Sequence, residues 1–283
     1  MAAVYLVSFA LYSVKKHDPA RRSRLLQPML VSSLFSWSFL GSSLVLCIAL
    51  LNQYADFWDL TIREVFGGAL LASISFATVM TFIARKHAFT KTLERMTGPV
   101  GLKGIGTGFT LLTSRMEIEG VSLREATLGS AFSVSLNGHG VVAVSPELVA
   151  LLSPDEMEAV VAHELSHIKN GDSTAKGLAR LARAAFPFDP LLRLVEAAVH
   201  RERELWADRV GVEFTRKPLA LASALIKANS PLRASTTGHI AGLFVGGSGR
   251  GLLSLYPDLE RRVDALLDLA RKMEIATSPA MVA

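Results

Sequence analysis

The stretch Val160–Asp172, with the sequence VVAHELSHIKNGD, places two histidines, two acidic residues and a lysine at the end of an apolar run. It is preceded by Ser-Pro-Asp-Glu at residues 153–156, a pattern typical of a helix start. The serine can cap the helix, proline suits the first helical position, and the glutamate can return a hydrogen bond to the serine. Asn170–Gly171 is typical of a helix end. The sequence therefore predicts one helix that begins after Ser153 and runs through His167.

Two histidines of this helix, His163 and His167, are four residues apart and share one face, so both imidazoles can bind one metal ion. Glu164 completes the His-Glu-x-x-His pattern of zinc peptidases. A catalytic zinc takes three protein ligands and lowers the pKa of a water molecule in the fourth position. A carboxylate beside the ion can accept a proton from that water and pass it to the leaving amine. We therefore expect one Zn²⁺ per chain, with His163 and His167 as ligands and Glu164 as the catalytic base.

A third zinc ligand is expected on a second helix, which should start at Asp189–Pro190. On this helix Glu204 and Asp208 are four residues apart, so Glu204 can complete a His₂Glu site while Asp208 orients a ligand histidine. Asp172 is expected to have the same orienting role. Glu202 competes for the place of the third ligand, but no acid follows it at that spacing. The alternative interpretation is a solvated, salt-bridged helix face, which is what charged runs usually form.

The rest of this region predicts a mainly α fold with a small β-sheet. Two β-prone runs, Ala131–Leu136 and Val141–Ser145, flank Asn-Gly-His-Gly, which is a hairpin signal. Further helices fit residues 219–228 and 258–273, where apolar residues recur at helical spacing.

Two long uncharged runs precede this region, at about residues 28–51 and 65–84. Each is long enough to cross a hydrocarbon core of ~30 Å as a helix. Two buried core helices are the alternative, but uncharged runs of this length favour membrane spans. The basic residues of the outer flanks are Lys15, Lys16, Arg21, Arg22 and Arg24 before the first run, and Arg85, Lys86, Lys91 and Arg95 after the second. Because the connecting loop at 53–64 is acidic, we expect a transmembrane hairpin in the cell membrane with both flanks in the cytoplasm.

The expected domain organisation follows from these segments. It comprises an apolar N-terminal segment with its basic flank (1–24), the transmembrane hairpin (25–95), a glycine-rich linker (96–108), a zinc metallopeptidase domain (109–275) and a disordered tail (276–283). Residues 1–14 are too short to span and lack the basic start of a secretory signal. An interfacial helix and a partial span both remain open for them.

Charge and cysteine content exclude other classes of protein. The net charge is +5, but the early basic residues flank apolar runs and do not alternate with aromatic residues, so we expect no nucleic-acid partner. The one cysteine, Cys47, lies in an apolar run and excludes both an intrachain disulfide and a cysteine-based zinc site.

Most of residues 120–272 resembles the HtpX-like membrane zinc metallopeptidases, which are relatives of the prenyl-protein (CAAX) proteases. The resemblance rests on AFSVSLNGHGVVAVSPELVALLSPDEMEAVVAHELSHIKNGD, then RERELWAD, HIAGLFV and YPDLERRV. It implies a zincin-like (gluzincin) peptidase fold, with His163, His167 and Glu204 as zinc ligands and Glu164 as the base. It also implies that an extended substrate lies along the edge strand at Ala131, Phe132, Ser133 and Val134, where backbone hydrogen bonds carry much of the affinity.

The chain departs from this family at two places. Family members commonly carry further apolar spans between the histidines and the third ligand, whereas residues 173–203 here are interrupted by charges. The stretch AAFPFDPLLRLVEAAVHRERELWAD instead resembles the peptidase domain of β-lactam sensor-transducers. The family usually has His-Pro where this chain has Tyr256–Pro257, with Arg262 still matching. We expect the Tyr256 hydroxyl to donate to the oxyanion that forms during hydrolysis. Packing of Tyr256 before a helix start is the alternative, and His239 and Arg262 are other possible donors.

The expected function is a membrane-anchored zinc endopeptidase that hydrolyses polypeptides. The family resemblance implies damaged or misassembled membrane proteins as its substrates. A sensor-transducer peptidase that cleaves a regulator on signal is one alternative, although the 53–64 loop is too short for a sensing domain. A non-catalytic membrane scaffold is another, but it would have no need of Glu164 beside the metal.

Overall fold

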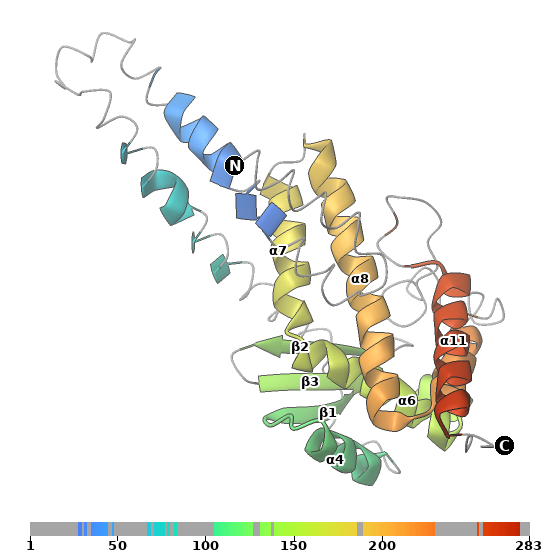
Figure 1. Cartoon of the computed structure of the whole chain (residues 1–283). Helices are drawn as coiled ribbons and strands as arrows, with labels where there is room; N and C mark the ends of the chain where they lie inside the picture. Colours follow the sequence, from blue (N-terminus) through green and yellow to red (C-terminus); the bar gives the residue numbers. More distant parts are fainter. Residues whose placement is uncertain are drawn as a thin grey trace. The chain divides into compact units, whose positions relative to one another are not determined.

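The computed structural model describes residues 28–29, 31–32, 35–44, 47, 67–68, 71–76, 78–79, 82–83, 105–126, 131–136, 139–185, 189–229, 254 and 257–277. The chain divides into two compact units. The first comprises residues 1–87 and 175–199, and the second comprises residues 88–174 and 200–283. Figure 1 gives the positions of the elements along the chain.

Helix α6, Pro154–Lys169, is the central helix of the second unit, and its predicted start is confirmed. The Ser153 hydroxyl accepts a hydrogen bond from the Glu156 N–H, and the Glu156 carboxylate accepts one from the Ser153 N–H. The helix ends at Asn170, and Gly171 follows with a φ of +65°, a conformation that glycine adopts without strain. The whole His-Glu-x-x-His segment, His163–His167, is buried in this helix.

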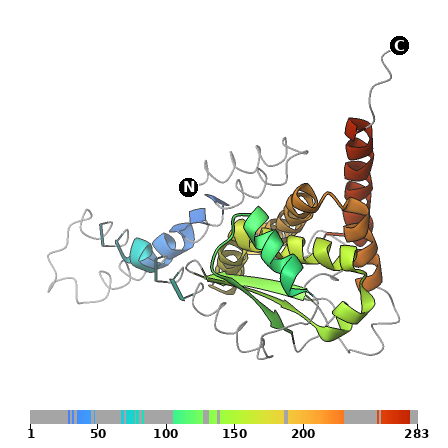
Figure 2. The same cartoon turned by 90° about the horizontal axis from the view of Figure 1, so that it is seen from below.

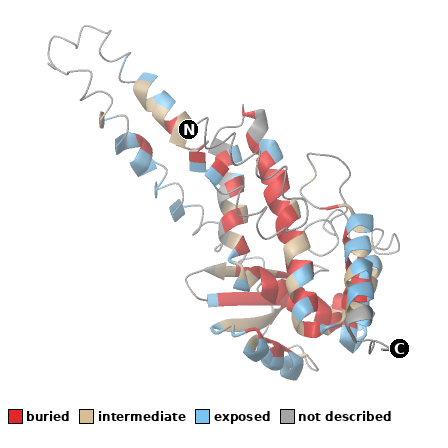
Figure 3. Cartoon of the chain, in the orientation of Figure 1, coloured by how far each residue is buried: buried red, intermediate tan, exposed pale blue. Residues whose placement is uncertain are grey.

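A three-stranded sheet with the order β1-β3-β2 lies against α6. Strands β2 (Ala131–Leu136) and β3 (His139–Val144) are antiparallel, which confirms the predicted hairpin, although β3 begins two residues earlier than expected. Strand β1 (Val121–Glu125) pairs with β3 in parallel and was not predicted. Figure 3 shows that β3 is buried, whereas β2 is at one edge of the sheet that the structure describes.

Helices α4 and α6 cover the same side of this sheet, as Figure 2 shows. Helix α4, Gly106–Arg115, contributes Phe109 and Leu112 to a core that also contains Val142 of β3 and Leu165 of α6. The first three residues of α4 fall within the expected 96–108 linker. A short helix, α5 (Pro146–Leu151), connects the sheet to α6.

All three segments predicted to be helical after α6 are helices: α8 (Pro190–Thr215), α9 (Pro218–Ala228) and α11 (Leu259–Thr277). Helix α9 packs between α6 and α11. Helices α6, α9 and α11 share one core, in which Leu165 of α6, Leu225 of α9 and Leu266 of α11 are buried. The C-terminal half of α8 belongs to this unit and carries Glu204 and Asp208.

The first unit combines the early helical segments with most of α7 (Asp172–Ala185) and the start of α8. Its core joins Met29 to alanines of α7 and to Leu192 of α8. The Trp37 indole donates a hydrogen bond of 2.9 Å to Asp189. The expected spans at 28–51 and 65–84 each contain both described residues and residues outside the described set. Within the described set, no helix combines the length and the apolar character needed to cross a membrane.

These observations confirm the fold class at the coarse level, since the second unit is mainly helical with a small three-stranded sheet.

Candidate metal centre

The two histidines of α6 point to one spot beside α8. The Nε2 atoms of His163 and His167 are 3.2 Å apart, and the rings meet edge to face at 87°. Both residues are buried, with 1% and 8% of their surfaces exposed. This arrangement follows from the helix, because residues four apart stand one turn above each other.

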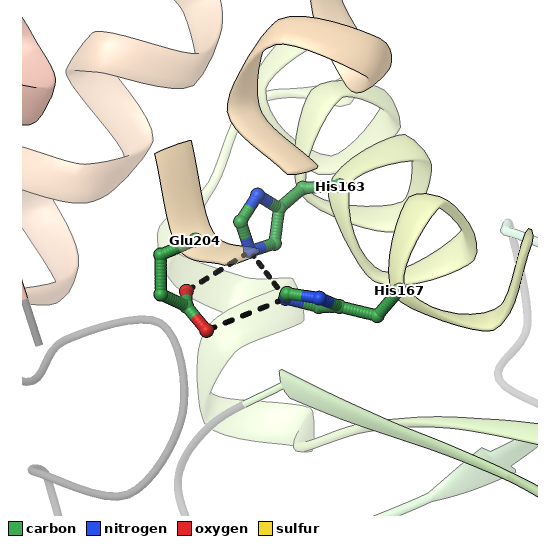
Figure 4. Close-up of side chains that lie close together, drawn as sticks. All are labelled: His163, His167 and Glu204. Carbon is green, nitrogen blue, oxygen red and sulfur yellow. Dashed lines mark hydrogen bonds and ion pairs between the residues drawn. The ribbon is translucent and has the colours of Figure 1, made fainter. Parts of the chain in front are cut away.

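Glu204 of α8 reaches the same spot from the opposite side, as Figure 4 shows. Its Oε2 lies 3.5 Å from His163 Nε2, and its Oε1 lies 3.5 Å from His167 Nε2. Within the part of the chain that the structure describes, this trio is the group of His, Cys, Asp or Glu residues whose ligand atoms lie within 4.8 Å of one another. Glu202, the competing acid, is buried on the same helix but is not a member of this group.

Each histidine is held at its other ring nitrogen by a carboxylate. The Nδ1 atom of His163 lies 2.9 Å from Asp208, and the Nδ1 atom of His167 lies 2.6 Å from Asp172. An Nδ1–H that donates to a carboxylate leaves the lone pair of Nε2 directed toward Glu204.

An arginine in turn binds each of these carboxylates. Arg262 of α11 donates to both oxygens of Asp208, at 2.8 and 2.6 Å. Arg203 of α8 donates to Asp172 at 2.6 Å and to the carbonyl of Asn170 at 3.1 Å. Both arginines are buried, so each histidine ends a histidine–carboxylate–arginine chain that fixes its ring.

The electrostatics of the site favour a positive charge between the carboxylates. Burial opposes the charged imidazole of His163, but hydrogen bonds to Asp208 and Glu204 outweigh it and raise its pKa to about 9. Burial likewise opposes ionisation of Asp208, yet the Arg262 charge and the His163 hydrogen bond keep its pKa below the usual value. The carboxylates around His163 therefore favour a cation at this position.

The close approach of α8 to α6 depends on Gly211. A Cβ atom at this position would lie 3.1 Å from the backbone nitrogen of His163 and 3.2 Å from its Cα. Contacts this short to backbone atoms force the two helices apart. Glycine therefore lets α8 bring Glu204 within reach of both histidines.

The expected base, Glu164, follows His163 directly on α6 and is 3% exposed. Its Oε2 accepts a hydrogen bond of 2.7 Å from the Ser133 hydroxyl of β2. Of the four expected substrate-binding residues of β2, Ala131, Phe132 and Val134 are buried and Ser133 is half-buried. The structure thus brings the edge strand and the base together through one serine.

Three residues were expected as possible hydrogen-bond donors to the oxyanion: Tyr256, His239 and Arg262. Tyr256 and His239 lie outside the described residues. Arg262 is described, and its guanidinium is directed at Asp208, with Nη1 at 3.7 Å from Glu204. Arg262 therefore faces the carboxylates behind the histidines.

Sequence reasoning missed three contacts of this site: Arg203 with Asp172, Arg262 with Asp208, and Ser133 with Glu164. No local spacing rule links any of these pairs, because the partners come from different elements. The run of charges at residues 201–204 is the only sequence signal for Arg203.

The residues present fit a zinc ion. Two imidazole nitrogens with fixed tautomers and one carboxylate are a typical donor set for catalytic zinc, and the buried carboxylates around them compensate a cation.

Comparison with known proteins agrees with this donor set. The model of peptidase family M48 matches residues 114–270. The chain is 34% identical over 180 residues to the "Protease HtpX homolog" of Pyrococcus abyssi, covering 49% of this chain and 62% of that protein. It is 32% identical over 182 residues to the one of Aquifex aeolicus, covering 48% of this chain and 60% of that protein. The match thus spans about three fifths of the length of these relatives.

Among solved structures, the crystal structure of S. mikatae Ste24p aligns over 86% of this chain and 64% of its own, with 15% identity and a TM-score of 0.43. The resemblance to HtpX-like peptidases is confirmed by sequence. Because the family model covers more than half of the chain, including His163, Glu164, His167 and Glu204, the chain belongs to peptidase family M48.

Proposed function

We propose that this protein is a membrane-anchored, zinc-dependent endopeptidase. The observation that carries the proposal is the convergence of His163 Nε2, His167 Nε2 and the Glu204 carboxylate on one buried spot. Membership of peptidase family M48 supports the same reaction class.

His163, His167 and Glu204 would hold the zinc ion in this proposal. When bound, the ion lowers the pKa of a water molecule and polarises the scissile carbonyl. Asp208 and Asp172 keep the two imidazoles in the tautomer that leaves Nε2 free to act as a ligand.

Glu164 would act as the general base and then as the general acid. Its Oε2 accepts from Ser133, so Oε1 is the oxygen that takes the proton from the attacking water. The same oxygen then delivers this proton to the amide nitrogen as the C–N bond breaks. Because the carboxylate is almost fully buried, the proton moves between partners held in fixed positions.

The substrate would be an extended polypeptide that adds to the edge strand at Ala131, Phe132, Ser133 and Val134. Backbone hydrogen bonds would hold it, which allows varied side chains.

The Tyr256 hydroxyl is proposed as a neutral donor to the developing oxyanion. If it has this role, Tyr256→Phe loses on the order of a hundredfold in turnover with zinc retained. Near-normal turnover would move the role to His239.

The transmembrane hairpin at 25–95, with the metallopeptidase domain at 109–275 on the cytoplasmic side, is part of this proposal. Support comes from the two uncharged runs and from the basic residues on both outer flanks. Proteins of the same membrane, in particular damaged ones, are the substrates that such an anchored peptidase meets at high local concentration.

Cleavage of casein by the detergent-purified full chain, with and without a chelator, tests the proposal. We expect activity that the chelator removes and added zinc restores. Glu164→Gln should be inactive while it keeps zinc, because an amide cannot accept the proton but leaves the three ligands in place. Full activity of Glu164→Gln would refute the assignment of the base.

A further inference from the structure

The backbone of β2 has two sides, and the hydrogen bonds of β3 identify them. The Gly140 N–H donates to the carbonyl of Gly120, and the Val144 carbonyl accepts from the Ala126 N–H, both on the β1 side of the sheet. The β2 partners of these two residues are Ser135 and Ala131. In an antiparallel ladder, residues that do not exchange hydrogen bonds with their partner direct N–H and C=O away from it. Ala131 and Ser135 therefore face the outer edge of β2.

A side-chain contact confirms this direction at Ser135. Its N–H donates a hydrogen bond of 3.2 Å to the hydroxyl of Ser173, at the start of α7. Ser133 lies midway between Ala131 and Ser135, so its backbone N–H and C=O also face the outer edge. Ser173 occupies the edge at Ser135 and Ala131 is fully buried, so the half-buried Ser133 is the position where an added strand would meet the backbone of β2.

The side chain of Ser133 points in another direction, toward α6. Its hydroxyl donates the hydrogen bond of 2.7 Å to Glu164 Oε2. Hydrogen bonds to a buried carboxylate are among the stronger ones in proteins, because burial makes loss of a partner costly. The contact thus fixes the rotamer of Glu164 and selects which of its oxygens remains for another proton.

We propose that Ser133 is a positioning residue: its hydroxyl holds the Glu164 carboxylate while its backbone faces the edge to which an extended polypeptide adds. The proposal deepens the peptidase function and rests on it. A substrate docked at the backbone of Ser133 is placed relative to Glu164 by one residue. The position of the substrate and the orientation of the Glu164 carboxylate therefore depend on the same residue. No flexible loop separates the two.

A pair of variants of the full chain, Ser133→Thr and Ser133→Val, isolates the hydroxyl. The two side chains have nearly the same shape and β-propensity, and only threonine keeps the donor. We expect Ser133→Val to have a kcat on the order of tenfold below that of Ser133→Thr, with similar KM and equal zinc content. The KM is retained because the strand edge is unchanged. Equal kcat values for the two variants would overturn the proposal.

A second measurement does not depend on activity. In chelator-treated protein, Ser133→Ala should lower the melting temperature by roughly 4 °C, because the buried Glu164 carboxylate loses its donor. The same change in a Glu164→Ala background should have little effect, since no carboxylate remains. Equal shifts in both backgrounds would mean that Ser133 contributes only packing, and the proposal would fail.

These outcomes separate the inference from the proposed function. If Glu164→Gln remains active, the peptidase assignment fails whatever Ser133 does. If Glu164→Gln is inactive but threonine and valine at position 133 give equal turnover, the peptidase assignment stands and Ser133 has no positioning role.

Discussion

Asp172 connects a ligand histidine to an arginine on another helix. One of its oxygens lies 2.6 Å from His167 Nδ1 and the other accepts from Arg203 at 2.6 Å, and all three side chains are buried or nearly so. Without the guanidinium, the Asp172 carboxylate would remain buried beside one histidine alone. The orientation of His167 therefore depends on Arg203, which does not itself reach the metal position.

We expect Arg203→Gln to lower zinc affinity by about 10–100-fold, the usual range for losing a group that orients a ligand. Stability should also fall by about 3 kcal/mol, because breaking a buried ion pair leaves one charge uncompensated. Competition with a chromogenic chelator measures the affinity. Arg209→Gln, at an exposed position of the same helix, is the matched control and should bind zinc normally. Equal affinities for the two variants would contradict the chain from Arg203 to His167.

Sequence alone could predict those contacts of the site that follow from helical spacing. His163 and His167 share a face because they are four apart, and Glu204 and Asp208 do so for the same reason. The sequence could not pair Arg203 with Asp172, or Ser133 with Glu164. Such pairs form only when elements distant in sequence pack together.

At the scale of elements, the distance between α6 and α8 decides whether Glu204 reaches the histidines. Gly211→Ala places a methyl group 3.1 Å from the His163 backbone nitrogen. We expect lower zinc affinity and a stability loss of about 1–3 kcal/mol, because overpacking moves the helices.

The control for this variant is Gly108→Ala in α4, where the added Cβ meets no atom within 4 Å. There, loss of glycine flexibility should stabilise the chain by about 0.5–1 kcal/mol. Thermal unfolding of both variants compares them. Stabilisation by Gly211→Ala with normal zinc binding would show that the helix spacing tolerates a methyl group.

Glu156 joins the start of α6 to α9. Although burial opposes its ionisation, hydrogen bonds from Lys227, Ser223 and the Ser153 N–H lower its pKa from 4.5 to about 2. A carboxyl whose folded-state pKa is lowered adds stability above its unfolded pKa, and this stability is lost as pH falls from about 5 to 2.

We therefore expect Glu156→Gln to cost about 1–3 kcal/mol at pH 7, allowing for the solvent-exposed part of Lys227. Its stability should depend less on pH between 5 and 2 than that of the unchanged chain. Denaturant unfolding across this pH range measures both, with Glu147→Gln at an exposed position of α5 as the control. Parallel pH curves for Glu156→Gln and the unchanged chain would show that the carboxylate makes no net contribution.

Elements with strong local signals were predicted, and those without them were not. Ser153–Glu156 marks the start of α6, and Asn-Gly between β-prone runs marks the β2–β3 hairpin. Strand β1 is five residues long and pairs with β3 in parallel. Parallel strands are not joined by a tight turn, so the sequence contains no hairpin signal for β1. Helix α4 begins in a glycine-rich segment that is typical of a linker. Packing of its Phe109 and Leu112 into the core stabilises this helix.

At the scale of the whole molecule, the proposed hairpin predicts which residues are accessible from outside the cell. In a Cys47→Ser background, Thr61→Cys in the connecting loop should react with an impermeant thiol reagent on intact cells. Lys16→Cys and Lys91→Cys should react only after permeabilisation, because both flanks are expected in the cytoplasm. The reverse pattern would place the peptidase domain outside.

The zinc content of the purified full chain tests the central claim most directly, because the assignment of His163, His167 and Glu204 does not depend on knowing a substrate. Elemental analysis should find one zinc per chain in the unchanged protein, in Glu164→Gln and in Glu202→Ala. It should find a large loss in His163→Ala, His167→Ala and Glu204→Ala, since removing one of three ligands weakens the site severely. Full zinc in Glu204→Ala together with loss in Glu202→Ala would contradict the account.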